Sequence, residues 1–484
     1  MSRSRISISL IGALALAACT ADRIDPVRPL PEGSPRTVST ASPGRYIVMA
    51  KSTGFSPDFA ARVAGLGGTV EQIHKGAGIA VLSKLSASAA AQIGAFAEVS
   101  DVQPDATFTL DAPLAAAHSD LSNVSANGGA VSPANAILFG WQWNMRLIGA
   151  DKAWAAGKLG APDVTVAILD TGIDYDNRDL TGLVDLSRSA SFVPSDDTLA
   201  TALFPTRNKI SDFNGHGTNV ATQVSSNAFA FAGVTSKTTL IGVKVLGASG
   251  GGNTSSVLNG VLWAADHGAD VANMSLGGGF AKAGNGRLVS FINRVFSYAS
   301  SKGMLVIVAA GNDATDLDRN GNVENTYCDV PHVVCVSAVG PALATDDVNT
   351  PTFYTNFGRS AISVAAPGGN AKLVNDKPVA SQWLWGADIA SWVWSFCSKT
   401  ELDIVDGVVG LPCASGGTIT GEIGTSQASP HVAGLAALLV AELGHGRPAQ
   451  IKTAILNSAL DLGQPGVDPY YGRGRIDVAK ALGL

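Results

Sequence analysis

The sequence predicts an α/β protein in which helices cover both faces of a parallel sheet, preceded by a small α+β unit. The first part rests on apolar strand-like runs that alternate with helical runs from residue 164 onward. The second rests on three strand-like and two helix-like stretches between residues 44 and 110. With 484 residues, 46% of them hydrophobic and 15% charged, the chain can bury a large core.

Residues 1–19 have the pattern of an export signal. Arg3 and Arg5 precede a largely apolar run, residues 6–18, that is too short to span a bilayer. The run ends in Leu-Ala-Ala and Cys19, which resembles the lipobox of bacterial lipoproteins, where the cysteine is diacylated. An ordinary cleavage site with an incidental cysteine is the alternative. We expect a protein exported from a bacterial cell, either lipid-anchored through Cys19 at a membrane or cell surface, or secreted.

The proline-rich residues 20–43 predict an extended tether. In the following unit, residues 44–110, short strand and helix patterns alternate. The expected strands are 45–49, 79–82 and 99–102, and the expected helices are 57–66 and 86–96. Residues 111–136 are small, polar and weakly patterned, so we expect a linker with a processing site there.

Residues 137–484 carry the larger α/β pattern. The clearest expected strands are 164–170, 239–246, 271–276 and 304–310, and the clearest helices are 255–267 and 288–301. Between residues 369 and 421 the pattern loosens into an insertion that is rich in tryptophan. Its tryptophans, for which we expect a packing role rather than a binding cage, are Trp383, Trp385, Trp392 and Trp394.

Two short motifs in this part place an aspartate and a histidine in suggestive surroundings. The run VTVAILD predicts a buried parallel strand with Asp170 at its carboxyl end, the edge where open α/β sheets place their sites. The motif NGHGT surrounds His216 with small residues, which leave its imidazole room to approach both a carboxylate and a hydroxyl.

A third motif, GTSQASP, places Ser426 in a glycine-rich turn just before an apolar helical run that begins at Val432. The first N–H groups of a helix lack partners, so they would stabilise negative charge beside the serine. Asp170 would hold the histidine tautomer, His216 would take the serine's proton, and Ser426 would attack a carbonyl carbon. Each residue alone has an ordinary explanation as a cap, turn or buried polar group, but the set favours catalysis.

In this order of aspartate, histidine and serine, the chain resembles the subtilisin-type serine proteases, the subtilase family. The resemblance runs from about residue 141 to 484, and its other landmarks follow in family order. They are DVANMSLGG at 270–278, VIVAAGN at 306–312, AAPG at 365–368 and GRGRID at 472–477. The resemblance implies a subtilisin-like fold and a serine endopeptidase that acts on proteins or peptides.

The resemblance also assigns further site residues. Asn312 would donate a hydrogen bond to the oxyanion of the tetrahedral intermediate, beside the Ser426 N–H. Asp313 would lie near the primary specificity pocket and help accept Lys or Arg before the scissile bond. Two segments, residues 245–252 and 275–278, would pair with the substrate backbone on its acyl side. The substrate-binding residues expected in them are Gly250, Gly251, Ser275, Leu276 and Gly277.

Residues 44–110 resemble, by pattern and position, the prodomain that assists the folding of secreted subtilases and then blocks the active site. A permanent partner-binding module is the alternative. Two residues depart from the family pattern. Asn219 stands where a second histidine is common, and Gln427 follows the nucleophile where methionine is usual. These departures bear on rate and substrate preference rather than on the reaction class.

Cysteine usage fits an exported protein. If Cys19 is lipidated, four cysteines remain, and their sequence-local pairing is Cys328 with Cys335 and Cys397 with Cys413. Four buried thiols are the alternative.

No cofactor is required for the expected chemistry, and the metal content stays unknown. Asp179 stands where many subtilases have a calcium-ligating aspartate, but the sequence offers no full set of about six to eight oxygen ligands. The formal net charge is −6 and no run of lysine and arginine occurs, so we expect no nucleic-acid partner.

Two other functions stay open: a membrane-tethered pseudoprotease that binds peptides without cutting them, and an esterase that uses the same triad. The intact set of catalytic residues argues against the first function, and the two strand-pairing segments argue against the second. For an unperturbed His216, with a pKa of about 6.5, the specificity constant should rise through weakly acidic pH.

Overall fold

The computed structural model describes residues 40–484 except 53, 111–116, 121–131, 284, 322, 326, 343–345, 372, 375–376, 379–390 and 406–407. The expected export signal, the tether and Cys19 lie outside the described residues, as do Trp383 and Trp385. Within the described part of the chain, no helix is long and apolar enough to cross a membrane.

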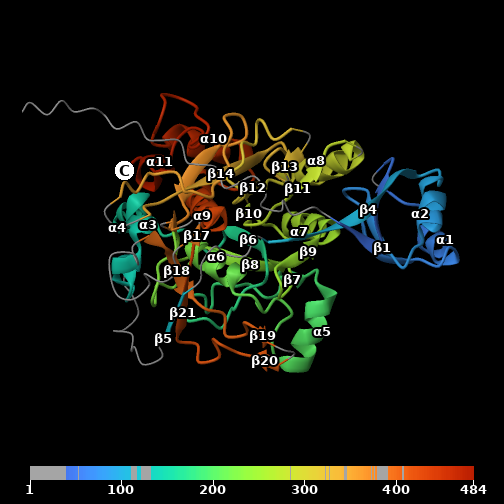
Figure 1. The fold of residues 1–484 in the computed structure, drawn as a ribbon, viewed down its shortest axis with the longest axis horizontal. Coiled ribbons are helices and arrows are strands. Elements are labelled where there is room, and N and C mark those ends of the chain that lie inside the picture. The colour runs from blue at the N-terminus through green and yellow to red at the C-terminus, as the bar shows by residue number, and fades with distance from the viewer. Residues whose placement is uncertain are drawn as a thin grey trace, which may run out of the picture.

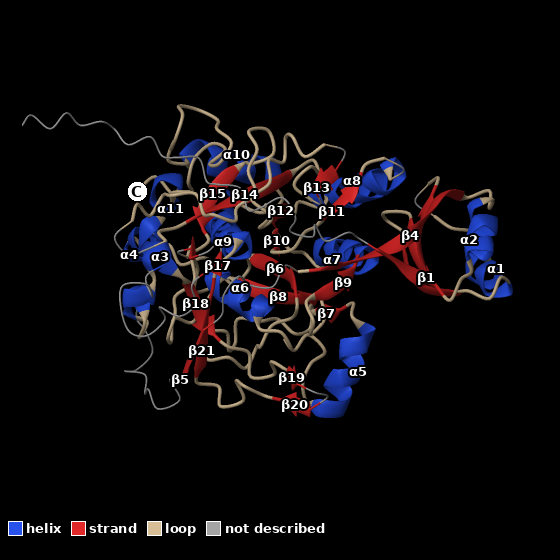
Figure 2. Ribbon diagram, in the orientation of Figure 1, coloured by secondary structure: helices blue, strands red, loops and turns tan. Residues whose placement is uncertain are grey.

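A seven-stranded parallel sheet forms the centre of the molecule (Figures 1 and 2). Its strands lie in the order β15-β14-β12-β10-β6-β8-β7. Their bounds are β6 Thr165–Asp170, β7 Ala190–Ser191, β8 Thr239–Lys244, β10 Val271–Met274, β12 Leu305–Ala309, β14 Val333–Val339 and β15 Val364–Pro367. The predicted α/β fold class is confirmed, and each of the four strands expected from residue 164 onward is present.

Helices cover both faces of this sheet. The main ones are α6 His216–Val224, α7 Thr254–Asp266, α8 Gly286–Ser301 and α9 Thr425–Leu443. Val166 and Ile168 of β6 pack in one hydrophobic core with α6 and α9. The residues between and after them, Ala167 and Leu169, pack in a second core with α7 and α8. Successive side chains of a strand point to opposite faces, so a wholly apolar strand is stable only with helices on both sides.

The N-terminal unit, residues 40–110, forms the lobe at the right of Figure 1. Its elements are β1 Thr40–Ala50, α1 Phe59–Gly65, β2 Thr69–His74, β3 Ile79–Ser83, α2 Ala87–Gly94 and β4 Val99–Thr109. The antiparallel strands lie in the order β2-β3-β1-β4, and β9 (Gly251–Asn253) of the larger part completes this sheet. The sequence prediction omits β2 because that strand buries none of its 6 residues, so its apolar pattern is weak.

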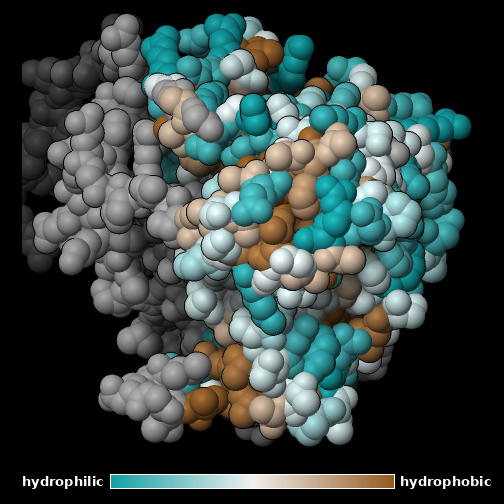
Figure 3. Space-filling model, turned by 90° about the vertical axis from the view of Figure 1, so that its right-hand side faces the viewer, coloured by the Kyte–Doolittle hydropathy of each residue, from teal (hydrophilic) through white to brown (hydrophobic). Residues whose placement is uncertain are grey.

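One face of the N-terminal sheet packs on the larger part of the molecule. Ile47, Met49 and Ile79 belong to the same core as α7 and α8. On the opposite face, α1 and α2 enclose a separate core around Phe59 and Ile93. Figure 3 looks at this side of the molecule, where hydrophilic residues cover most of the described surface with apolar ones between them.

The tryptophan-rich insertion adds a small antiparallel sheet. Its strand β18 (Val393–Phe396) pairs with β21 (Thr418–Glu422), and the other edge of β21 pairs with β5 (Ala117–Asp120). The expected linker therefore contains a strand. Trp392 and Trp394 are each 5% exposed and belong to the core beneath α6 and α9, which agrees with the expected packing role.

Short elements and two disulfides complete the structure. Disulfides join Cys328 to Cys335 and Cys397 to Cys413. The remaining elements are two 3₁₀ turns at Pro133–Asn135 and Phe139–Trp141, with α3 Trp143–Leu147, α4 Ala150–Ala155, α5 Pro194–Leu203, β11 Gly279–Ala281, β13 Val323–Asn325, β16 Leu373–Val374, β17 Lys377–Pro378, β19 Asp403–Val405, β20 Val408–Gly410, α10 Pro448–Ser458 and α11 Val478–Ala481.

Candidate active site

Asp170 and His216 lie together at the carboxyl edge of the central sheet. Strand β6 ends at Asp170, helix α6 begins at His216, and Nδ1 of the imidazole lies 2.7 Å from Asp170 Oδ1. The aspartate is 0% and the histidine 3% exposed. Small residues permit this approach, because a Cβ at Gly217 would lie 2.2 Å from the Gly172 carbonyl oxygen. With Nδ1 engaged, the other ring nitrogen is the one available to a hydroxyl.

The helix that carries Ser426 begins earlier than predicted. Helix α9 starts at Thr425 rather than near Val432, so Pro430 lies inside the helix and not in its first turn. Proline lacks the N–H that would bond to the carbonyl four residues earlier, which is the carbonyl of Ser426. Ser275 Oγ supplies the missing donor at 2.7 Å. Ser275 is fully buried, so this hydrogen bond holds the backbone of Ser426 in place.

The hydroxyl of Ser426 donates to the Ser275 carbonyl oxygen at 3.2 Å. Among the described residues no hydrogen bond joins this hydroxyl to His216, so it would have to change partner before a proton could pass from it to the imidazole. Unliganded catalytic sites often show such loose contacts. The helices that carry Ser426 and His216 nevertheless touch beside these residues. Gln427, next to Ser426 in α9, has its Nε2 3.5 Å from Oδ1 of Asn219, which lies in α6 with His216.

Asn312 lines a cavity beside Ser426, and Thr425 orients its amide. Asn312 Oδ1 accepts hydrogen bonds from the Thr425 N–H and hydroxyl, both at 2.9 Å. The Thr425 hydroxyl in turn accepts from the Gly311 N–H at 3.0 Å. Within the described part of the chain Nδ2 of the Asn312 amide forms no hydrogen bond, so it can donate to a ligand in the cavity. This group and the Ser426 N–H in the first turn of α9 are two candidate donors to an oxyanion.

Carboxylates control the charge state of His216. Burial acts to lower the pKa of His216, but its attraction to Asp170, their hydrogen bond, and the charges of Glu422 and Asp212 raise it to about 9. This value replaces the usual pKa of about 6.5 used for the sequence-based expectation. The sequence could not reveal how many carboxylates the fold gathers around the ring.

If His216 is the base that accepts the serine's proton, it must be neutral to act, so we expect kcat/KM to rise with pH through about 9. Rates on a peptide substrate, measured from about pH 6 to about pH 11, report this limb. A rise of kcat/KM centred near the ordinary histidine pKa would show that the surrounding carboxylates do not act on the ring.

The N-terminal unit extends a strand along the expected substrate groove. Strand β4 pairs antiparallel with β9, where Phe108 lies opposite Gly252 and Thr109 lies opposite Gly251. The Leu110 N–H donates to the Gly250 carbonyl at 2.9 Å. The predicted glycine segment thus pairs with an extended backbone, and here that backbone belongs to the protein itself.

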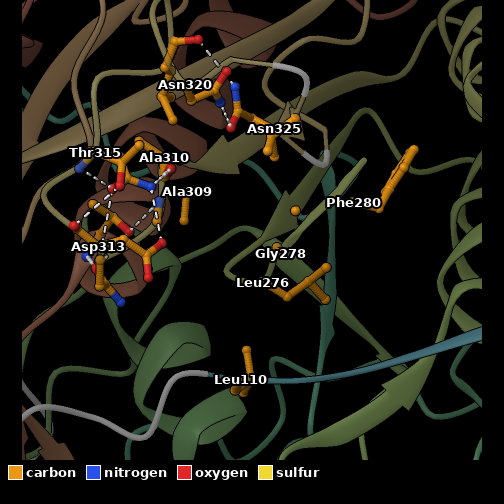
Figure 4. A pocket seen from close by; sticks show the side chains of 18 of the residues that line it. Leu110, Leu276, Gly278, Phe280, Ala309, Ala310, Asp313, Thr315, Asn320 and Asn325 are labelled. Atoms are coloured by element: carbon orange, nitrogen blue, oxygen red, sulfur yellow. Dashed lines mark hydrogen bonds between the residues drawn. The ribbon is translucent and has the colours of Figure 1, made fainter. Parts of the chain in front are cut away.

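The cavity beside Ser426 has a volume of about 290 Å³. Figure 4 shows Leu110, at the end of β4, on one side of it and Asp313 on another. Its walls are mainly small or apolar, and they include Leu276, Gly277, Gly278, Ala309 and Ala310. Asp313 lines the cavity and is exposed to solvent. Its N–H donates to Asn356 Oδ1 at 3.0 Å, and its Oδ2 lies 3.5 Å from Asn356 Nδ2.

Asp179, the residue considered for calcium, is buried and already occupied. Its Oδ1 accepts from the Ala230 N–H at 2.9 Å and its Oδ2 from the Phe231 N–H at 3.1 Å. Burial raises the pKa of Asp179 to about 7 against these hydrogen bonds. Backbone N–H groups donate to both carboxylate oxygens of Asp179, so this side chain anchors the loop before β8. The same N–H groups would repel a cation, so Asp179 does not fit the role of a calcium ligand.

One cluster of metal-ligand atoms occurs among the described residues, and its members are Cys397, Glu401 and Cys413. The two cysteines form a disulfide, so they offer no thiolate to a metal ion.

The sequence prediction omits several buried carboxylates, among them Asp212, Glu422 and Asp105. Glu422 is 4% exposed and lies shortly before Ser426. Asp105 is 0% exposed and accepts hydrogen bonds from the N–H and hydroxyl of Ser255, at the start of α7. A lone acidic residue in an otherwise uncharged strand next to Ser426 was the available signal for Glu422.

The comparisons with known proteins agree with this geometry. A model of the subtilase family matches residues 161–474. Thermitase from Thermoactinomyces vulgaris is 30% identical over 345 residues, which are 70% of this chain and 95% of the relative. Subtilisin DY from Bacillus licheniformis is 31% identical over 342 residues, 70% of this chain and 97% of the relative.

Solved structures extend the likeness in fold to the N-terminal unit. The epidermin leader peptide processing serine protease EpiP from Staphylococcus aureus has a TM-score of 0.68 at 21% identity. The match covers 91% of this chain and 98% of that chain. Fervidolysin from Fervidobacterium pennivorans has a TM-score of 0.63 at 21% identity, over 93% of this chain and 62% of that chain.

Proposed function

From the premise that this chain belongs to the subtilase family of serine proteases, we propose that it is an exported endopeptidase that processes itself. The proposed triad is Asp170, His216 and Ser426. The observation that carries the proposal is the 2.7 Å contact of His216 with Asp170 at the sheet edge to which helix α9 brings Ser426.

In the proposed reaction, His216 takes the proton of Ser426 Oγ while that oxygen attacks the carbonyl carbon of a peptide bond. Asp170 stays ionised, holds the ring and stabilises the imidazolium. Asn312 Nδ2 and the Ser426 N–H donate to the oxyanion. The imidazolium then protonates the leaving amine, and water hydrolyses the acyl-enzyme by the same steps in reverse.

We also propose that residues 44–110 are an inhibitory prodomain. Leu110 lines the cavity beside Ser426, where a substrate's acyl side would bind. Strand β5, which begins at Ala117, pairs with β21, the strand that leads toward Ser426. Leu110 thus lies beside Ser426, and Ala117 lies opposite Gly421 on the strand that precedes it, so we expect the bond cut during maturation to lie between Leu110 and Ala117.

Asp105 supplies a test of how the proposed prodomain is held. Its carboxylate accepts from the Ser255 N–H at 2.9 Å and hydroxyl at 2.6 Å, where the dipole of α7 favours negative charge. Replacing Asp105 with Asn removes this charge, so the cut prodomain should leave sooner. We expect the lag before full activity to shorten about tenfold, since hydrogen bonds to charged groups contribute roughly 1.5–3 kcal/mol.

The control for this test is Glu71→Gln. Glu71 binds the Arg45 side chain at 2.7 Å, as Asp105 does at 3.1 Å, but within the described part of the chain Glu71 itself forms no hydrogen bond with α7. The pair of Arg45 with Glu71 is partly exposed, so its contribution should be small. An equal shortening of the lag by both variants, followed as peptide hydrolysis after mixing, would argue against a specific role for Asp105.

A second prediction concerns specificity. The carboxylate of Asp313 should favour Lys or Arg before the scissile bond, but only by a few-fold, because solvent screens an exposed charge. A peptide library cleaved by the wild type and by Asp313→Asn reports the ratio of basic to apolar sites. An unchanged ratio would remove Asp313 from the specificity pocket.

Export and anchoring are part of the proposal and concern the N-terminal residues. Mass spectrometry of the mature N-terminus, which tolerates an acylated residue, distinguishes a diacylated Cys19 from an unmodified end beyond the processing site. An N-terminus beginning at Cys19 in the active protein would show that the N-terminal unit is a permanent module.

Two rival functions predict different reactivity. A pseudoprotease would bind peptides but would not react with a fluorophosphonate at Ser426. An esterase would hydrolyse a simple ester but leave casein intact. The pairing of β4 with β9 supports the peptidase, because an extended peptide backbone already occupies the proposed acyl-side groove.

A further inference from the structure

Glu422, at the end of β21, is a buried carboxylate in the neighbourhood of the proposed triad. It is 4% exposed, and within the described part of the chain no lysine or arginine forms an ion pair with it. Removing a carboxylate from water without a cation is unfavourable unless hydrogen bonds and a nearby positive charge compensate. The groups around Glu422 therefore indicate what it does.

A hydrogen-bonded network holds the Glu422 carboxylate. Gln427 Nε2 donates to Glu422 Oε2 at 2.6 Å and lies 3.5 Å from Asn219 Oδ1. Asn219 Nδ2 in turn donates to Ser395 Oγ of β18 at 3.0 Å. The two residues that depart from the family pattern, Asn219 and Gln427, thus form one unit with Glu422 and the insertion.

The charged groups around Glu422 indicate that its electrostatic partner is His216. The groups that act on His216 are Asp170 at the end of β6, Asp212 before α6 and Glu422 on β21. Glu401, after β18, adds a further carboxylate near Asp212 and Glu422. Among these five groups, only the imidazole becomes positive, either by binding a proton below its pKa or by taking the serine's proton above it.

The ionisation of Glu422 suits this pairing. Burial raises its pKa, the charge of His216 lowers it, and the charges of Asp170 and Asp212 raise it, to a value of about 7. Glu422 is therefore ionised in the alkaline range where His216 is neutral and able to act as a base.

We propose that Glu422 is a positioning residue whose carboxylate, held by the Gln427 amide, stabilises the imidazolium that forms at His216 during attack by Ser426. The inference rests on the proposed function, because it concerns the same reaction. Glu422 touches neither substrate nor the reacting atoms, and it acts only through the charge of His216.

This role has a distinctive pH signature. Below the pKa of His216 the resting enzyme already carries the imidazolium, so Glu422 stabilises the ground state and the transition state alike, and the effects cancel. Above that pKa the ring is neutral in the resting enzyme and charged in the transition state, so Glu422 stabilises only the transition state and thereby raises kcat. Removing the carboxylate should therefore reduce kcat at alkaline pH and leave the rates well below the pKa of His216 unchanged.

The test compares wild type with Glu422→Gln from about pH 7 to about pH 10.5, after active-site titration with a fluorophosphonate. We expect the pKa of the kcat/KM limb to fall by about one unit in Glu422→Gln. The alkaline plateau of kcat/KM should fall about tenfold, through kcat rather than KM, because one pKa unit is a tenfold factor. Glu422→Asp, which keeps the charge, should recover part of the alkaline rate.

Two further variants make the result decisive. Glu401→Gln removes a carboxylate of the same cluster that has no contact with Gln427, and it should leave the limb in place. Gln427→Met removes the donor that holds Glu422, and it should shift the limb in the same direction, so the inference is testable even if Glu422→Gln does not fold.

An unchanged limb in both Glu422→Gln and Gln427→Met, or a loss of equal size at every pH, would overturn the inference and leave the triad intact. A wild type that hydrolyses no peptide at any pH would overturn the proposed function together with the inference.

Discussion

Ser426→Ala is expected to abolish peptide hydrolysis. The substitution removes the attacking oxygen while the bracing contact of Ser275 with the backbone carbonyl of residue 426 remains, so the fold should be preserved. In subtilisin, loss of the serine reduces turnover about 10⁶-fold, and we expect a loss of that order. Hydrolysis of casein and of a short peptide, with circular dichroism to verify folding, measures it.

The same variant tests self-processing. If the N-terminal unit is cut from the larger part by the triad itself, Ser426→Ala should accumulate as one uncut chain, whereas the wild type separates into two pieces. A denaturing gel of protein made in a host lacking other proteases reports the sizes. Cutting between Leu110 and Ala117 in Ser426→Ala would show that another enzyme performs this step.

Asn312→Ala is expected to have the second largest effect. Its amide oxygen is held by two donors of Thr425 at 2.9 Å, so the Nδ2 group is preorganised to donate where an oxyanion would form. Loss of the oxyanion-hole asparagine of subtilisin reduces kcat about 10²–10³-fold, and we expect a similar loss here.

The expected loss should appear in kcat with little change in KM, because the amide stabilises charge that exists only in the transition state. Asn320→Ala is the matched control, since Asn320 lines the same cavity but its Nδ2 donates to Asn325 instead. Equal losses in the two variants would indicate damage to the cavity and not loss of an oxyanion donor.

Much of the architecture follows from local patterns. The continuous apolar run that ends at Asp170 requires helices on both faces of the sheet. The structure agrees, because Val166 and the next residue, Ala167, pack in two different hydrophobic cores. Strand β2 escapes this reasoning because its residues are exposed or half-buried, and its pairing with β3 holds it in the sheet.

The start of α9 shows what local patterns cannot give. Pro430 favours a helix start nearby, yet the helix begins at Thr425 because a residue distant in sequence, Ser275, satisfies the carbonyl that proline leaves without a donor. The role of Glu422 could not be predicted from local patterns either. It depends on the hydrogen bond from Gln427 and on the charge of His216, and only the fold brings these groups together.

Fluorophosphonate labelling followed by peptide mass spectrometry tests whether Ser426 is a nucleophile activated by His216 and Asp170. We expect the wild type to carry one adduct, on Ser426. Ser426→Ala should carry none, and labelling of His216→Ala should be too slow to detect in the same time. An unlabelled wild type, or an adduct on a residue other than Ser426, would contradict the account.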